Sequence, residues 1–506
     1  MIKKYYEYLY EISKEMLLEG LIGQGLFSEK LPPIFSSESF YNLLKKEFFD
    51  KGKPLPFNVR NGCDYVRYES VRNINVPRQL SIPNPFAYAK LCKIIADNWD
   101  KLKVFFKEKT KNHEFKISRI HIRKLTNTRC LFKMNYKNFF MDNDPTLNLL
   151  IGKRFVVKTD ISNCFPSIYS HSIPWAIKGR GVSKNNKNHW SDKIDEAVRL
   201  IKYKESDGLL IGPHVSNLIS EIILCTVDDE LYKKGYHFIR NIDDYECFVE
   251  TFEKGEKFLL DLSKELRKYN LSLNLKKTTL TELPLTTVEN WISQLNSHIL
   301  ILEKDKVKSP FLRNFWNFVV NLFKDNNYNS AILNYAIKMI STKKLNKYAL
   351  EYHLKTVHHL VLLYPYLVGL LDEFLFTPFV QNEVSIIKTF ANDIFRNGKA
   401  KNLFESMSYA LFFALKYNFK IEEDDLFAIA EESKDAVLML LCYLFDKKNN
   451  NSITKYERLA ENIKGEGEED KYWIFTYEVL SQAKLDGNYK FIKKEGISFV
   501  KDEYNA

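Results

Sequence analysis

The chain has 506 residues and a formal net charge of +11 at pH 7. Its hydrophobic share of 45% excludes a disordered chain, and its length favours two or more domains over a single core. The positive charge favours a polyanionic partner such as nucleic acid or nucleotide triphosphates, although a basic surface can also be an ordinary solvated one.

The first half of the chain alternates between helical and strand patterns. A helix is expected within the first 30 residues, because Leu9, Ile12 and Met16 recur at helical spacing, and a proline-broken extended stretch follows at about 55–90. The next expected elements are a helix over 87–106, strands over 117–123 and 155–159, helices over 192–204 and 216–231, a strand over 236–239, a helix over 252–269 and a strand over 271–275. The helix over 216–231 is predicted to be amphipathic. This alternation predicts an α+β fold, a palm-like sheet with helices packed on one face.

Beyond about residue 300 the pattern becomes almost entirely helical. A linker is expected over 304–310, followed by apolar-striped helices at 345–363, 383–395, 406–417 and 434–445. Successive helices of this length are compatible with a HEAT-like array. We therefore divide the chain into domains at 1–300 and 301–506.

Cysteine usage and hydropathy indicate a cytoplasmic, soluble protein. The seven cysteines are scattered and include no C-x-x-C pair, which favours reduced thiols over a disulfide framework or a zinc site. The N-terminus does not resemble a signal peptide, and the most apolar window, 357–371, is too short to span a bilayer. No membrane association is expected.

Acidic residues end two of the predicted strands. The strand over 155–159 leads into Asp160, and the strand over 236–239 is followed by Asp243 and Asp244. Carboxylates held at neighbouring strand ends can bind a pair of Mg²⁺ ions, which clamp the attacking and leaving oxygens in phosphoryl transfer. An Asp-Asp pair also arises by chance on solvated faces, so its meaning depends on the surrounding motifs.

Five features, in this order, resemble the fingers and palm of reverse transcriptases over roughly residues 70–280. They are Pro77–Asn84, Asp160 with Phe165, Gly208–Leu218, Arg240–Tyr245 and Leu273–Thr278. The resemblance implies that Asp160, Asp243 and Asp244 are catalytic and that the metal-binding set is Asp160, Ile161, Asp243 and Asp244. Asp243 is expected to be the direct ligand of the pair, with Asp244 supporting it. The implied cofactor is Mg²⁺, with Mn²⁺ able to substitute.

The same resemblance implies a dNTP site. Arg78 would meet the triphosphate, Phe165 would lie under the sugar and exclude a 2′-hydroxyl, Gly212 would lie beside the nascent base pair, and Lys277 would neutralise phosphate charge. A surface arginine in a proline-rich loop is the plain alternative for Arg78, and a core aromatic is the alternative for Phe165.

Three positions depart from the reverse transcriptase pattern. Leu210 stands where proline is usual, Ile211 where a polar residue often touches the nucleotide, and Asn241 where an aromatic residue is usual. These departures put ordinary templated selection in doubt.

A further stretch, Tyr169–Gly179 followed by Ser183–Asn185, resembles the abortive-infection polymerases of bacteria and phages, most closely the phage-borne member, as does the sequence around Arg78. This resemblance implies a fingers-palm unit fused to a HEAT-like helical domain, with no conventional thumb. It also implies template-independent DNA synthesis primed by a tyrosine, a single-stranded DNA product attached covalently to the protein, and a homo-oligomer. The basic insertion 178–187 would track the departing strand, or is a plain solvated loop.

Tyr8 is the predicted primer among the four tyrosines near the N-terminus, because on a helical wheel it faces outward with Lys4 and Glu11. The alternatives are an aromatic-rich helix packed on its neighbour and a priming tyrosine elsewhere in the chain or in another subunit. Two rival functions stay open, namely a conventional RNA-templated reverse transcriptase and a catalytically silent palm that serves as a binding scaffold.

Overall fold

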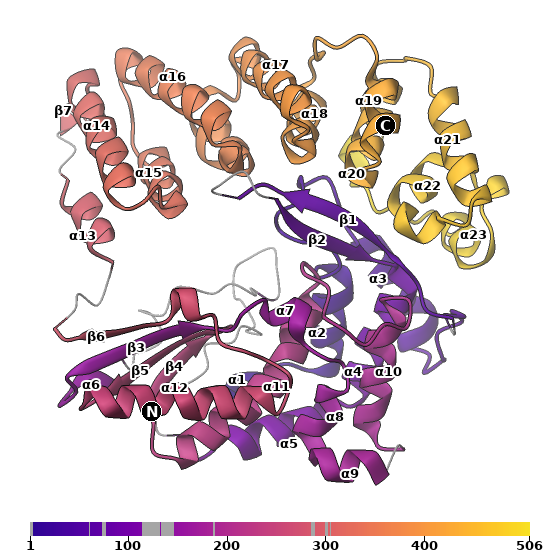
Figure 1. Cartoon of the computed structure of the whole chain (residues 1–506). Coiled ribbons are helices and arrows are strands. Elements are labelled where there is room, and N and C mark those ends of the chain that lie inside the picture. The colour runs from indigo at the N-terminus through magenta and orange to yellow at the C-terminus, as the bar shows by residue number, and fades with distance from the viewer. Residues whose placement is uncertain are drawn as a thin grey trace.

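The computed structural model describes residues 4–59, 61–72, 77–113, 132, 146–185, 188–284, 289–298, 302–303 and 305–505. Two arrays are visible in Figure 1: a mixed α/β part from the first half of the chain, and an arc of helices from the second half above it. The strand expected over 117–123 and two residues of the basic insertion, 186 and 187, lie outside the described residues.

The N-terminal part contains a hairpin and a set of helices. Its elements are α1 (Tyr5–Tyr10), α2 (Lys14–Leu18), a π-helix (Glu19–Gly23), α3 (Glu38–Leu44), β1 (Tyr65–Ser70), β2 (Arg78–Pro83), α4 (Pro85–Asp97) and α5 (Trp99–Thr110). The first predicted helix is therefore broken, because the Ser13 hydroxyl accepts the Met16 N–H at 3.2 Å and starts a new helix there. Similarly, the helix predicted over 87–106 is divided at Asn98.

A four-stranded antiparallel sheet follows, in the order β4-β5-β3-β6. Its strands are β3 (Phe155–Asp160), β4 (His237–Asn241), β5 (Asp244–Val249) and β6 (Thr279–Glu282). The strands expected at 155–159 and 236–239 are confirmed, whereas the one expected at 271–275 is wrong. That segment makes only a single bridge, from Leu273 to Ile161, and a 3₁₀ turn at Leu275–Lys277 precedes β6.

Helices α11 (His214–Lys233) and α12 (Phe252–Arg267) cover one face of this sheet, as expected for a palm-like layer (Figure 1). Their neighbours in the chain are α6 (Thr146–Leu150), α7 (Cys164–Ser167), α8 (Ser172–Lys178), α9 (Arg180–Asn185) and α10 (Trp190–Leu200). The amphipathic character predicted for 216–231 is wrong. Helix α11 is enclosed on nearly all sides, and its Glu221 and Asp228 side chains are each only 1% exposed.

The second half of the chain is an arc of helices. These are α13 (Asn290–Ser297), α14 (Ser309–Asp325), α15 (Ser330–Ser341), α16 (Lys347–Leu363), α17 (Val384–Lys401), α18 (Phe404–Tyr417), α19 (Leu426–Ser433), α20 (Ala436–Lys448), α21 (Thr454–Gly465), α22 (Trp473–Val479) and α23 (Gly487–Lys494). The four helices predicted here are all present. Within the linker predicted over 304–310, β8 (Lys306–Val307) pairs with the preceding β7 (Leu302–Glu303), and α14 already begins at Ser309.

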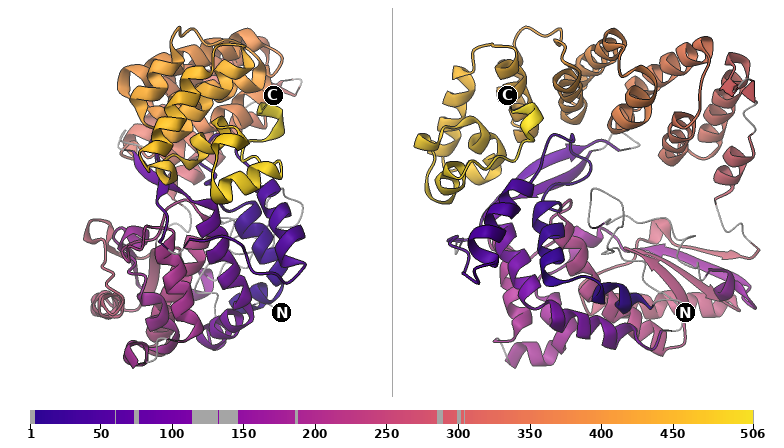
Figure 2. Two further views of the ribbon diagram at one scale, coloured as in Figure 1. Left: turned by 90° about the vertical axis from the view of Figure 1, so that its right-hand side faces the viewer. Right: turned by 180° about the vertical axis from the view of Figure 1, so that it is seen from behind.

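The end of the arc returns to the N-terminal part, as Figure 2 shows from behind. Helices α18, α20 and α22 pack on β1. The backbone N–H of Ser36 donates to the carbonyl of Phe499 at 2.9 Å, and the Phe499 ring lies 5.5 Å from that of Phe40. One continuous hydrophobic core therefore includes residues from both halves. A domain boundary near residue 300 stays a prediction.

The cysteines and the apolar helices bear on the expectations of reduced thiols and of no membrane association. The six cysteines within them are all unpaired and buried. No helix in the described part of the chain is both long enough and apolar enough to cross a membrane.

Candidate active site

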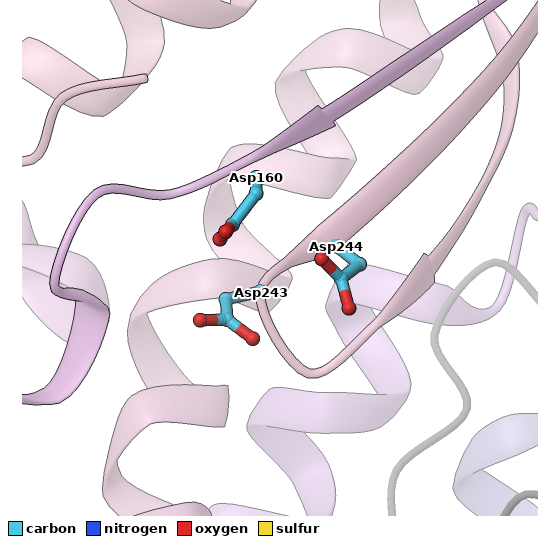
Figure 3. Close-up of side chains that lie close together, drawn as sticks. All are labelled: Asp160, Asp243 and Asp244. Atoms are coloured by element: carbon cyan, nitrogen blue, oxygen red, sulfur yellow. The ribbon is translucent and has the colours of Figure 1, made fainter. Parts of the chain in front are cut away.

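Three aspartates meet at the ends of strands β3, β4 and β5 (Figure 3). Asp160 is the last residue of β3, Asp243 lies in the turn between β4 and β5, and Asp244 is the first residue of β5. Asp160 and Asp244 are directly paired across the sheet, and one carboxylate oxygen from each of the three residues lies within 4.8 Å of the others. Among the described residues this is the one cluster of potential metal ligands. The antiparallel register thus joins residues that are more than 80 positions apart.

The electrostatics of the cluster suit a divalent cation. Partial burial, followed by the negative charges of Asp244 and Asp160, raises the pKa of Asp243 to about 6. The Lys277 ammonium donates to Asp160 at 2.5 Å, and this bond raises the pKa of Lys277. Three carboxylate groups close together supply oxygen ligands, which are the kind that Mg²⁺ prefers. The residues present therefore fit a divalent metal site.

The backbone of Ile161 belongs to the same cluster. Its N–H donates to the carbonyl oxygen of Asp243 at 3.2 Å, which ties the end of β3 to the β4–β5 turn. The Ile161 side chain is 1% exposed and packs in the core. Only its backbone carbonyl oxygen could serve as the metal ligand predicted from the sequence.

A buried ionic network supports the turn that carries Asp243. Arg240 is fully buried, and its guanidinium donates to both carboxylate oxygens of Asp228, to Glu221 at 2.9 Å and to the carbonyl of Ile242 at 2.7 Å. Ile242 has a φ of 61°, a strained value for a β-branched residue, so the turn needs an external support. The hydroxyl of Tyr245 donates to Asp228 at 3.1 Å.

Sequence reasoning missed this network. Arg240 was named only as a flanking residue of the Asp-Asp motif, and Glu221 and Asp228 were given no role within the helix predicted over 216–231. The one usable signal was the heptad spacing of Glu221 and Asp228, which places two acidic residues on the same side of α11. An arginine two residues before a catalytic turn is the natural partner for such a pair.

The residues predicted for the nucleotide lie on segments that are joined to the triad. Arg78 is the first residue of β2. Partial burial, and after it the charge of Arg72, lowers the pKa of Arg78, whereas the nearby Asp243 carboxylate raises it. The carbonyl of Phe165 accepts the N–H of Leu209 at 2.7 Å, so the segment after β3 is bonded to the glycine-bearing loop. The Phe165 ring is half-buried against the core.

Gly212 connects this loop to the hairpin. It has a φ of 127°, and an added Cβ would lie 3.1 Å from the carbonyl oxygen of Ser81 in β2. The preceding residue, Ile211, accepts the Ser81 N–H through its carbonyl at 2.8 Å. Glycine is thus required by both conformation and close backbone approach.

The structure modifies the expectation for Tyr8. Helix α1 packs against α5, and Tyr8 is half-buried rather than facing outward. Tyr10, two residues later, is 47% exposed, and the Lys103 ammonium lies 5.4 Å from the centroid of its ring. A priming role for Tyr8 stays a prediction.

Comparison with known proteins agrees with this geometry. Residues 90–309 match the family model described as reverse transcriptase (RNA-dependent DNA polymerase), a range that contains the triad, Phe165, Gly212 and Lys277. The chain thus carries a reverse transcriptase domain and is a nucleotidyltransferase of the reverse transcriptase-like polymerase type. No curated protein matches the chain.

Solved structures with similarity include telomerases, and each score is low. The apo telomerase from Candida tropicalis truncated from its C-terminal domain is 16% identical, with 50% of this chain and 57% of that chain covered and a TM-score of 0.28. The apo telomerase from Candida tropicalis is 12% identical, with 73% of each chain covered and a TM-score of 0.34. The Candida albicans telomerase in complex with a telomeric RNA fragment is 12% identical over 74% and 70%, with a TM-score of 0.30. Likenesses at this level carry no argument about activity.

Proposed function

We propose that this chain is an abortive-infection DNA polymerase that joins dNTPs by two-metal phosphoryl transfer, without a template and with a tyrosine of the protein as primer. The observation that carries the polymerase chemistry is the carboxylate cluster of Asp160, Asp243 and Asp244 inside the reverse transcriptase domain. The abortive-infection assignment is supported by the stretch Tyr169–Gly179 and by a second half made of helices.

Each residue of the site has a defined task on this proposal. The three aspartates hold Mg²⁺, or Mn²⁺ in its place, and the bound ions supply the positive charge that activates the attacking oxygen and stabilises the departing pyrophosphate. The Arg78 guanidinium holds the triphosphate, since its planar fork matches phosphate oxygens. Phe165 lies under the sugar and selects dNTPs over ribonucleotides.

Template independence is supported by the glycine-bearing loop. Ile211 places an apolar, half-buried side chain where a polar residue would contact a nucleotide, and its backbone carbonyl is already used by Ser81. Residues 208–213, which form this loop before α11, have only glycine, proline and aliphatic side chains. The loop therefore offers no side-chain hydrogen bond that could test whether a templated base pair is correct. Base selection would then rest on stacking and on the triphosphate alone.

The primer on this proposal is the Tyr8 hydroxyl, so that the single-stranded DNA product stays attached to the protein, which assembles as a homo-oligomer. Exposure favours Tyr10 of the same helix as the alternative primer. Both residues lie on α1, so a pair of phenylalanine variants separates them without disturbing the triad.

The testing experiment supplies purified protein with Mg²⁺ and labelled dNTPs, and no nucleic acid. Label that stays on the protein through a denaturing gel, and is removed by DNase or by protease, supports self-primed synthesis. Tyr8→Phe is then compared with Tyr10→Phe, and Asp243→Asn serves as the inactive control. Incorporation that requires an added primer and RNA template would instead establish a conventional reverse transcriptase.

A scaffold is separated from an enzyme in cells that are challenged with phage. An abortive-infection polymerase loses its protective effect on Asp243→Ala substitution, whereas a scaffold keeps it. Light scattering on the purified protein tests the homo-oligomer, and a monomer at assay concentration would contradict that part of the proposal.

A further inference from the structure

A carboxylate from the helical half holds the end of the β1–β2 hairpin. Glu405, in the first turn of α18, is 5% exposed. One of its oxygens accepts the Ser70 hydroxyl at 2.9 Å, and the other accepts the backbone N–H of Val71 at 2.6 Å. Both oxygens are therefore used on two consecutive residues at the point where β1 ends, more than 330 positions away in the chain.

This contact lies opposite the residue predicted to bind the triphosphate. In the antiparallel register of the hairpin, Ser70 is the direct cross-strand partner of Arg78. Among the described residues the β1–β2 sheet has two strands, and a two-stranded hairpin has little stability of its own. The position of the hairpin at this end therefore depends on its contacts with other elements, and Glu405 supplies one that uses both carboxyl oxygens.

The anchor lies in a crowded, largely apolar pocket. Burial raises the pKa of Glu405 to about 7, against the lowering effect of the two hydrogen bonds and of Lys30. The Asp435 carboxylate also raises the pKa of Glu405. Burial, and after it the charge of Glu405, raises the pKa values of the neighbouring Tyr68 and Tyr409 hydroxyls. A buried carboxylate is costly for packing alone, so its hydrogen bonds to the hairpin give it a directional role.

We propose that Glu405 is a positioning residue for nucleotide binding, through which α18 of the helical half fixes the β1–β2 hairpin and so aims Arg78 at the triphosphate of the incoming dNTP. The inference rests on the proposed function, because it needs a nucleotide at the triad. It makes the helical half a component of the nucleotide site, and no contact between Glu405 and substrate is required.

The chain offers a control with the same chemistry elsewhere. Glu478 in α22 is also buried, and it also accepts a serine hydroxyl, from Ser498, and the next backbone N–H, from Phe499. It anchors the C-terminal segment and does not contact the hairpin residues that Glu405 binds. Glu405→Gln and Glu478→Gln each replace a buried carboxyl group by an amide and remove the same kind of bond.

The experiment measures binding of a non-hydrolysable dNTP analogue to the full-length protein with Mg²⁺ by calorimetry, and the dNTP dependence of incorporation. Because a glutamine side chain has one acceptor oxygen and cannot accept from both Ser70 and Val71, Glu405→Gln is expected to weaken the Kd and raise the KM about 10-fold. The kcat at saturating dNTP should change less than about 3-fold. Glu478→Gln should leave Kd and KM unchanged at a comparable melting temperature, and Ser70→Ala, a milder change, should move them in the direction of Glu405→Gln.

A double-mutant cycle tests whether Glu405 acts through Arg78. If it does, Arg78→Ala with Glu405→Gln binds the analogue no more weakly than Arg78→Ala alone. Additive losses, or an unchanged Kd in Glu405→Gln, would overturn the inference while leaving the polymerase assignment intact. Analogue binding without incorporation would overturn the proposed function and leave the inference standing, and absence of binding by the wild type would overturn both.

Discussion

Replacing Arg240 by methionine is the most incisive test of how the candidate site is held. The substitution keeps the bulk of the side chain and removes every bond that the guanidinium makes to Asp228, Glu221 and the Ile242 carbonyl. Both acidic groups are only 1% exposed, so neither can recover its hydration without opening the core.

The size of the effect follows from that burial. Breaking a buried ion pair by removing one partner costs about 3–5 kcal/mol, because an uncompensated charge remains inside the protein. A typical folded domain is stable by only about 5–15 kcal/mol, so the variant should be near the limit of folding. Arg240→Lys retains the charge but cannot reach two carboxylates and a carbonyl at once, and it should fall between the wild type and Arg240→Met.

The assay is urea denaturation followed by circular dichroism, together with dNTP incorporation at a temperature where the variant is folded. Lys399→Met is the matched control, because Lys399 pairs with Glu423 at 2.9 Å with half of its own side chain exposed. That surface pair should contribute no more than about 1 kcal/mol. Folded Arg240→Met should also lose at least about 10-fold in incorporation, since the support of the strained turn is gone. Equal midpoints for Arg240→Met and the control would refute this reasoning.

Three further predictions concern the metal and the nucleotide loop. The pKa of Asp243 is higher in the folded protein, about 6, than its ordinary value of 3.8, so its ionisation opposes folding and stability is lost as the pH rises through 6. Asp243→Asn should therefore raise the melting temperature of metal-free protein more at pH 7 than at pH 5 in calorimetry, and a fall would contradict this. Lys277→Ala should tighten Mg²⁺ binding in a titration, because the ammonium no longer competes for Asp160, and should slow incorporation; weaker binding would count against it. Gly212→Ala should raise the KM for dNTP, because a Cβ would press on β2 at 3.1 Å, whereas Gly465→Ala, with open space around it, should not.

The local elements of the site were predictable from the sequence because their signals are local. Strand β3 is a short apolar run that ends on Asp160, and an Asp-Asp pair directly after a second strand indicates a turn with carboxylates. The same reasoning failed for the strand expected at 271–275 and for the outward orientation expected of Tyr8, whose priming role stays a prediction. The pairing of the segment at 271–275 depends on Ile161, which bridges Leu273. The break in the N-terminal helix depends on the Ser13 side chain, which caps the second helix.

Residue type and flanking pattern were enough to place Asp160, Asp243 and Asp244 at strand ends. The roles of Arg78, Gly212 and Lys277 follow from the resemblance to reverse transcriptases and stay predictions. How the carboxylate cluster and the hairpin are held became visible only in the folded chain. Arg240 with its two acidic partners, and Glu405 with the β1–β2 hairpin, are contacts between segments distant in sequence. The stability of a buried charge depends on the partner and the dielectric that surround it after folding. Neither the ion-pair partner nor the local dielectric produces a periodic pattern in the sequence from which it could be predicted.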